Sequence, residues 1–226
     1  MENPRFLFLC AMAWLTPAAS ARAQSVPALP EAPKEVGGVR FFHEYNLGWG
    51  DHWELFPADS GTGRRERGTL TLSQQTGIEM GGRARVFALL NAGFHDLKSA
   101  KIVAEWLSKG DDSEAFLKWI LLWWLMPLVP FADAHCLAGP GFSFDVNTEY
   151  PRFFFEVGAG LSGIRLAQNR DYVLGGSFFA GVGLRLTDSL SLLLRTVYAP
   201  PFMAFSAVTE TDVHAISTSL LFGFSR

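Results

Sequence analysis

The sequence is poor in cysteine, poor in charge and lacks an apolar run long enough for a membrane-spanning helix. Its 226 residues include two cysteines, Cys10 and Cys136. The first lies in a segment that we expect to be removed, which excludes a disulfide within the mature chain. Charged residues make up 18% of the sequence and form no block of one sign. The electrostatic footprint of a nucleic-acid-binding protein is therefore absent, and we expect no nucleic-acid partner.

Common catalytic signatures are also missing. The sequence has no GxSxG, no glycine-rich phosphate loop and no paired-cysteine motif in a suitable context. What it has instead is apolar and aromatic content: 49% hydrophobic residues, with 20 Phe, 7 Trp and 22 Gly. This mixture excludes a disordered chain, and the length favours a single domain.

Residues 1–23 have the pattern of a signal peptide. Arg5 precedes the apolar run 6–15, and Ala21-Arg22-Ala23 fits an A-x-A cleavage site. The alternative is a retained membrane anchor, but the run is about half of the roughly 20 residues that a spanning helix requires. We therefore expect export with cleavage near Ala23. Residues 24–37, rich in Pro and Ala, are expected to form a flexible lead-in.

From Val39 onward, apolar and polar residues alternate with a period of two, which is typical of strands. In the first segment, Phe41 and Trp49 share one face while Glu44 lies on the other. The pattern recurs in the segments 39–49, 69–80, 83–94, 142–146, 153–165, 177–186, 190–198 and 214–224. Such segments suit the roughly 9–11 residues of a tilted membrane-spanning strand. The pattern predicts eight strands.

Two all-β architectures fit this alternation. In a soluble β-sandwich or lipocalin-like barrel the apolar face points inward and the polar face meets water. Here the second face carries Gly, Ser and charges of both signs rather than the Lys and Glu of a solvated surface. Small residues on that face suit the narrow interior of an eight-stranded barrel, and aromatic residues near the segment ends suit interfacial girdles. These features favour a membrane barrel.

The chain resembles the OmpA/OmpX-type family of small outer-membrane β-barrels. The resemblance rests on the signal peptide, the eight alternating segments, the tight turns and the closing strand SLLFGFSR, and it covers residues 39–94 and 136–226. It implies an eight-stranded antiparallel up-and-down barrel over 38–226, with a helical insertion in one external loop at 95–135. It also implies an outer-membrane location, a periplasmic lead-in and recognition of the C-terminal strand by the barrel-assembly machinery. Ser225-Arg226 after Phe224 departs from the usual aromatic ending.

The family topology starts the first strand in the periplasm. Gly81-Gly82, residues 147–151 and residues 187–189 then become short periplasmic turns. The external loops become 50–68, 95–135, 167–171 and 199–213, three of which are longer than any of the turns.

Charged residues on the second face form a predicted lumen network: Arg40, Glu44, Glu79, Arg83, Arg85, Asp145, Glu156, Arg185 and Arg195. A buried charge is costly unless it is paired, and both signs are present. One interpretation is a structural network that plugs the interior. The other is a narrow gated pore in which the pairs exchange partners.

The insertion 95–135 departs from the alternating pattern. Its apolar stretch FLKWILLWWLMPLVPF ends at Pro127 and Pro130, too early for a spanning helix. A helix carrying Trp119, Trp123 and Trp124 suits the headgroup boundary of a membrane. A cap over the barrel mouth, or a surface for a protein partner, is the equal alternative.

The histidines give no metal signature. His43, Asp51, His52 and Glu54 lie close in sequence, but their spacing matches no ligand motif, and we predict no metal site and no cofactor. His95 and His135 bracket the insertion and suggest proximity at the barrel rim. His214 and Ser217 are three residues apart on one strand, so they face opposite sides and cannot form a catalytic dyad.

The sequence therefore favours a non-enzymatic barrel with a structural or surface role, contacting outer-membrane lipid or a protein partner through its external loops. Two alternatives stay open. One is a lipid-modifying enzyme of acyl transfer or deacylation, and the other is a narrow small-solute pore.

Overall fold

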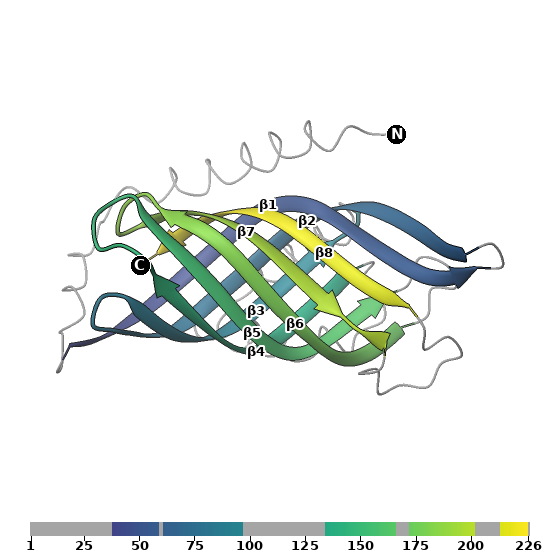
Figure 1. The fold of residues 1–226 in the computed structure, drawn as a ribbon, viewed down its shortest axis with the longest axis horizontal. Coiled ribbons are helices and arrows are strands. Elements are labelled where there is room, and N and C mark those ends of the chain that lie inside the picture. The colour runs from purple at the N-terminus through teal and green to yellow at the C-terminus, as the bar shows by residue number, and fades with distance from the viewer. Residues whose placement is uncertain (1–37, 59–60, 97–133, 166–171, 202–212, 226) are drawn as a thin grey trace, which may run out of the picture. The chain divides into compact units, whose positions relative to one another are not determined.

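A computed structural model describes residues 38–58, 61–96, 134–165, 172–201 and 213–225 of the chain. Eight antiparallel strands form a closed barrel in sequence order, and β8 pairs with β1 to complete it (Figure 1). The strands are β1 Val39–Ala58, β2 Gly61–Met80, β3 Ala84–Phe94, β4 Ala134–Asp145, β5 Arg152–Arg165, β6 Tyr172–Arg185, β7 Leu190–Ala199 and β8 His214–Ser225. The predicted eight-stranded antiparallel barrel is confirmed.

Three short turns join strands at one end of the barrel, which we call the short-turn end. Gly81 and Gly82, between β2 and β3, both have positive φ, 57° and 68°. A hairpin turn with positive φ at two successive positions favours glycine there, because other residues rarely adopt that conformation. Between β4 and β5, Asn147 Oδ1 accepts a hydrogen bond of 2.7 Å from the Phe153 amide. Between β6 and β7, Thr187 Oγ1 accepts bonds from the amides of Ser189 and Leu190.

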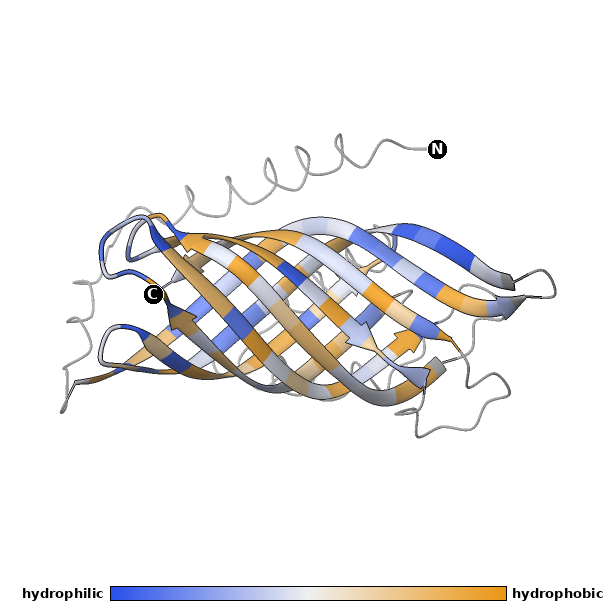
Figure 2. Ribbon diagram, in the orientation of Figure 1, coloured by the Kyte–Doolittle hydropathy of each residue, from blue (hydrophilic) through white to orange (hydrophobic). Residues whose placement is uncertain are grey.

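The opposite end, which we call the loop end, differs from the prediction in the first hairpin. The pairing of β1 with β2 continues to Ala58 and Gly61, so the predicted loop 50–68 was wrong: most of it is strand. The β2–β3 pairing reaches only Leu70, and the β1–β8 pairing only Leu55. The hairpin therefore projects beyond the other strands (Figure 1) and is mostly hydrophilic there (Figure 2).

The strand after the second external connection is also longer than expected. β4 begins at Ala134, eight residues before the predicted segment 142–146, so His135 belongs to a strand rather than to the insertion. The predicted helix and its tryptophans Trp119, Trp123 and Trp124 lie outside the described residues. Within the described ranges, no helix combines the length and the apolar character needed to cross a membrane.

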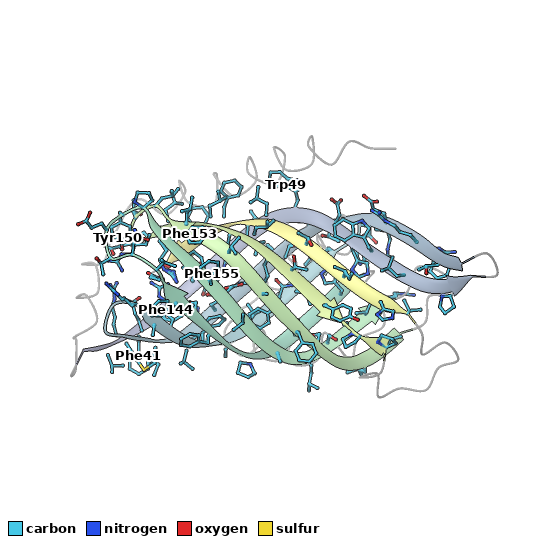
Figure 3. The ribbon with its side chains drawn as sticks, viewed as in Figure 1. Phe41, Trp49, Phe144, Tyr150, Phe153 and Phe155 are labelled. Carbon is cyan, nitrogen blue, oxygen red and sulfur yellow. The ribbon has the colours of Figure 1, made fainter. Side chains whose placement is uncertain are left out.

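The barrel has an apolar exterior. Phe41 is 72% exposed, Val157 54% and Leu194 45%, and other large apolar side chains on the outside are Trp49, Phe142, Phe144, Phe153, Phe155, Phe178, Val182 and Phe224. Apolar and polar residues alternate along the strands (Figure 2). Figure 3 shows aromatic side chains on the outer surface near the short-turn end, with Trp49 farther along the barrel. This arrangement reverses the usual one of a water-soluble barrel.

The interior is filled. It contains buried polar and charged groups, as expected, but among the described residues also three apolar clusters that the alternation did not reveal. The first consists of Phe42, Phe87, Leu89, Leu137, Phe179 and Val197, the second of Phe154, Leu193 and Leu221, and the third of Ile164, Ala199 and Ala215. Glycines make room for the rings: a Cβ at Gly158 would lie 2.3 Å from Cζ of Phe179. The small residues that face the lumen therefore leave room for large neighbouring side chains and do not line a channel.

Candidate functional site

Buried ion pairs occupy the lumen toward the short-turn end. Arg85 Nη2 lies 2.6 Å from Glu79 Oε2, and its Nη1 lies 3.3 Å from Glu44 Oε2. Ser191 and Ser225 donate to Glu44 at 3.0 and 3.1 Å. Because both Glu44 oxygens accept bonds from neighbours on other strands, this carboxylate links β1 to β3 on one side and to β7 and β8 on the other.

A second group joins β4, β5 and β6. Arg185 Nε lies 3.2 Å from Asp145 Oδ1, and Arg152 Nη1 lies 3.7 Å from Asp145 Oδ2. The Arg185 guanidinium also lies over the Phe154 ring, 4.1 Å from its centroid. A guanidinium over an aromatic face is favoured electrostatically when water is excluded.

The central ion pair is Arg195 with Glu156, whose side chains are 1% and 0% exposed. Arg195 Nε lies 2.5 Å from Glu156 Oε1, and its Nη1 donates to Ser73 at 2.9 Å. Gln75 donates to the second Glu156 oxygen at 2.8 Å. Every charge in this pair has several partners, which is the condition under which a buried pair is tolerated.

Seven of the nine residues of the predicted lumen network lie in these groups: Glu44, Glu79, Arg85, Asp145, Glu156, Arg185 and Arg195. Arg40 and Arg83 do not. Both are exposed at the short-turn end, and Arg83 lies in the β2–β3 turn. Arg152, which the sequence analysis did not select, adds a charge to this set. In these groups the carboxylates and the guanidinium groups neutralise one another across the lumen.

A different group of side chains occupies the lumen at the loop end. His52 on β1, His95 just after β3 and His135 on β4 have ring centroids 4.8, 4.9 and 5.4 Å apart. One nitrogen from each ring lies within 4.8 Å of the other two. His52 and His135 are 1% and 3% exposed. His52 and His135 are therefore buried, whereas His95, just beyond the end of β3, is partly exposed.

Polar neighbours surround His52. Its Nδ1 lies 2.6 Å from Ser217 Oγ, and its Nε2 lies 3.6 Å from Glu54 Oε1. Arg67 Nη2 lies 2.5 Å from the same Glu54 oxygen and also donates to the Arg165 carbonyl. The cluster thus has one carboxylate and one guanidinium beside it.

The electrostatic environment of His95 disfavours its protonated form. Burial lowers its pKa well below the ordinary value, and the neighbouring His135, His52 and Arg67 lower it further, while a backbone hydrogen bond with Gly68 opposes the shift. A neutral imidazole is the form that ligates a metal ion.

The strand geometry divides the group that the sequence suggested, which is His43, Asp51, His52 and Glu54. His43 and Asp51 face outward, where His43 contacts Tyr45 and Gln74, whereas His52 and Glu54 face the lumen. The suggested proximity of His95 and His135 is present, and His52 joins them. The sequence contained a signal for the inward position of His52 that the analysis did not use. Side chains alternate between the two faces of a strand, so His52 and Glu54 share the inward face of β1 with Glu44.

Ser217, His52 and Glu54 also have the residue types of a hydrolytic triad, but the atoms do not match one. In such a triad the serine contacts Nε2 and the carboxylate contacts Nδ1. Here Ser217 contacts Nδ1, and Glu54 lies beyond hydrogen-bond distance of Nε2. The three side chains are buried in the lumen, away from the apolar exterior. His214, which the sequence analysis placed on the opposite face of the strand from Ser217, contacts the Tyr198 hydroxyl at 2.7 Å.

Comparison with known proteins finds similarity in solved structures alone. No family model matches the sequence, and no curated protein does. The Ail attachment invasion locus protein of Yersinia pestis, solved with the heparin analogue sucrose octasulfate, has 11% identity and a TM-score of 0.42 over 81% of this chain and 99% of its own. Neisserial surface protein A has 12% identity and a TM-score of 0.42 over 83% of this chain and 97% of its own.

The N-terminal β-barrel domain of Pseudomonas aeruginosa OprF has 9% identity and a TM-score of 0.40 over 81% of this chain and 97% of its own. These identities and scores are too low to carry a ligand or partner from those proteins to this chain. The order, direction and register of its own strands make the fold that of a small eight-stranded barrel, the kind that the sequence resembles.

Proposed function

We propose that this chain is an outer-membrane barrel with a closed interior, and that it acts through its external surface as a structural or lipid-contacting protein. The observation that carries this proposal is the combination of an apolar exterior with a lumen filled by paired charges and packed rings. A membrane accepts such an exterior, because every backbone group of a closed barrel is paired between strands.

The family topology supports the orientation. With the short-turn end in the periplasm, the projecting β1–β2 hairpin and the segment 95–135 lie outside the cell. Export by the signal peptide at 1–23, with 24–37 as a periplasmic lead-in, agrees with this arrangement.

The external hairpin offers a surface for anionic lipid headgroups. Arg64 and Arg65 lie on opposite faces of it, with their guanidinium carbons 5.6 Å from the ring centroids of Trp53 and Phe56, and Arg64 also pairs with Glu66 at 2.7 Å. Arginine beside aromatic rings suits the boundary between headgroups and water. The tryptophans of the insertion, Trp119, Trp123 and Trp124, would add an apolar contact to the same leaflet. A protein partner at 95–135 is the competing use of that surface.

The experiment is tryptophan fluorescence in proteoliposomes, with variants that retain Trp119, Trp123 and Trp124 while Trp49, Trp53 and Trp106 are replaced by Phe. Contact with lipid predicts strong quenching by brominated acyl chains and protection from an aqueous quencher. Full accessibility to the aqueous quencher would overturn the lipid-contact part of the proposal. Heat-modifiable gel migration of each variant establishes that the barrel has formed.

The enzymatic alternative has a direct test as well. If the chain remodels lipid, expression in an outer-membrane host will change the acylation pattern of lipid A in mass spectra. We expect an unchanged pattern, because the serine and histidine of the loop end face the lumen and have the reversed nitrogen order described above.

A further inference from the structure

We propose that His52, His95 and His135 bind one divalent transition-metal ion, with zinc as the expected ion, in the lumen at the loop end. Three different parts of the chain supply the ligands: the middle of β1, the residue after β3 and the start of β4. The inference goes beyond the surface role proposed above, since it concerns the closed interior.

The spacing of the rings fits a shared ion. Zinc lies about 2.0–2.1 Å from a histidine nitrogen, so three imidazoles on a tetrahedral ion have their centroids about 5 Å apart. The observed centroid separations are 4.8, 4.9 and 5.4 Å. The ligating nitrogens of such a site are about 3.3 Å apart, whereas here they lie within 4.8 Å of one another. Ring rotation and small shifts would close this difference without moving a strand.

The cluster contains a buried polar group that an ion would satisfy. His135 is 3% exposed, and within the described part of the chain neither of its ring nitrogens has a hydrogen-bond partner. A buried polar group without a partner is costly, commonly by about 1–3 kcal/mol. Coordination of one ring nitrogen would replace the missing bond, and a purely structural role for this histidine provides no such compensation.

The surroundings also resemble the outer shell of a metal site. Ser217 Oγ contacts Nδ1 of His52 at 2.6 Å, which fixes the ring and makes Nε2 the ligating atom. Glu54 Oε1 lies 3.6 Å from that Nε2, so the carboxylate can supply negative charge or a fourth ligand. Arg67 holds this carboxylate in place.

Gly93 provides space for His135. It is the direct cross-strand partner of His135 in the β3–β4 pairing. A Cβ at Gly93 would lie 2.0 Å from Cε1 of His135 and 2.5 Å from its Nε2. The ring therefore occupies the volume that any other residue at position 93 would fill, and replacing this glycine would displace a ligand without removing one.

The chemistry of the three histidine ligands limits which metal ions the site can bind. Neutral imidazoles suit zinc, copper and nickel, whereas calcium and magnesium require oxygen ligands. Because neither cysteine nor a second carboxylate belongs to the described cluster, three nitrogens with Glu54 or water in the fourth position form the expected coordination.

The test uses untagged full-length protein refolded in detergent after removal of metal with a chelator. Zinc content is measured by mass spectrometry after dialysis, affinity by competition with a chelating dye, and geometry by the visible absorption of the cobalt-substituted protein. We expect about one zinc per chain and the intense absorption of tetrahedral cobalt. Absence of stoichiometric zinc in folded wild-type protein would overturn the proposal.

Variants locate the site. His135→Ala and His95→Ala should each weaken zinc binding by at least about tenfold, a loss that even outer-shell changes commonly produce. His214→Ala is the matched control, because His214 lies at the same end of the barrel but contacts Tyr198 instead. Unchanged zinc affinity in both ligand variants would also refute the site.

Gly93→Ala is the most discriminating variant, because it leaves all three histidines in the chain. We expect it to weaken zinc binding while the barrel still shows heat-modifiable migration. If His135→Ala does not fold, His95→Asn decides the question, because His95 lies outside the strands and its loss does not interrupt a pairing. Zinc affinity equal to the wild type in folded His95→Asn would contradict the proposal.

Discussion

The centre and the loop end of the lumen use buried polar groups in opposite ways. In the centre, Arg195 and Glu156 satisfy each other, and hydroxyl and amide side chains satisfy the remaining atoms. At the loop end, three imidazoles gather with His135 unsatisfied among the described residues. A satisfied network stabilises the barrel and fills the lumen, whereas a buried polar group without a partner costs free energy that a bound ion can offset. The comparison assigns a structural role to the centre and, with the ion proposed above, binding to the loop end.

The largest effect should come from breaking the central ion pair. Glu156→Leu leaves the Arg195 charge buried without its main partner, which should reduce the free energy of unfolding by about 3–5 kcal/mol. Urea unfolding in lipid vesicles, followed by gel migration, measures this change. The double variant Glu156→Leu with Arg195→Met is the control and should recover most of the loss. A single variant as stable as the wild type would show that the network is not structural.

The next effect concerns the exterior. Leu194 is 45% exposed in the middle of β7, so Leu194→Arg would place a charge against the acyl chains and should cost about 2–4 kcal/mol. Met80→Arg, at the end of β2 beside the Gly81 turn, should cost about 0–1 kcal/mol because it lies near the interface. The same unfolding assay compares them. Equal costs at both positions would contradict a lipid-facing belt.

The third effect separates the loop end from the rest of the lumen. If zinc binds the folded barrel alone, a concentration of 100 times Kd should stabilise it by about 2.7 kcal/mol. His135→Ala should lose this gain, whereas Glu156→Leu with Arg195→Met should retain it. Stabilisation of His135→Ala by zinc to the same extent would mean that the ion binds elsewhere.

The smallest effect lies in the external hairpin, which contains one exposed and one buried ion pair. Arg64 and Glu66 are 57% and 51% exposed, and Glu66→Gln should change stability by at most about 1 kcal/mol. Glu54 is 3% exposed beside Arg67, and Glu54→Gln should cost more. Thermal unfolding of the two matched variants compares them directly. A larger loss in Glu66→Gln would contradict the assigned burial.

The barrel itself was predictable because alternation is a local property. The side-chain period of two, the Gly81-Gly82 turn and the other short turns specify strands and their connections without knowledge of distant contacts. The length of β1 and β2 was not predictable in this way. Gly50, Asp51 and Pro57 favour a loop locally, and pairing across the hairpin from Asp51 to Ala58 overrides that preference.

The sequence predicts which residues face the interior, but it does not predict which of them contact one another. The alternation of faces along each strand predicts that Glu44, Arg85 and Glu156 face inward. Which charged side chains form ion pairs, however, depends on how the eight strands are staggered around the barrel. The same limit applies to the histidine cluster. His52, His95 and His135 come from three parts of the chain, and their approach follows from the closed register rather than from any sequence motif.

The most direct test of the closed interior is single-channel recording of the folded wild-type barrel in planar bilayers. The account predicts no stable conductance steps above background, because paired charges and packed rings fill the lumen at the level of Arg195 and Phe179. Uniform conductance steps that disappear when the protein is heat-denatured would contradict it and establish the pore.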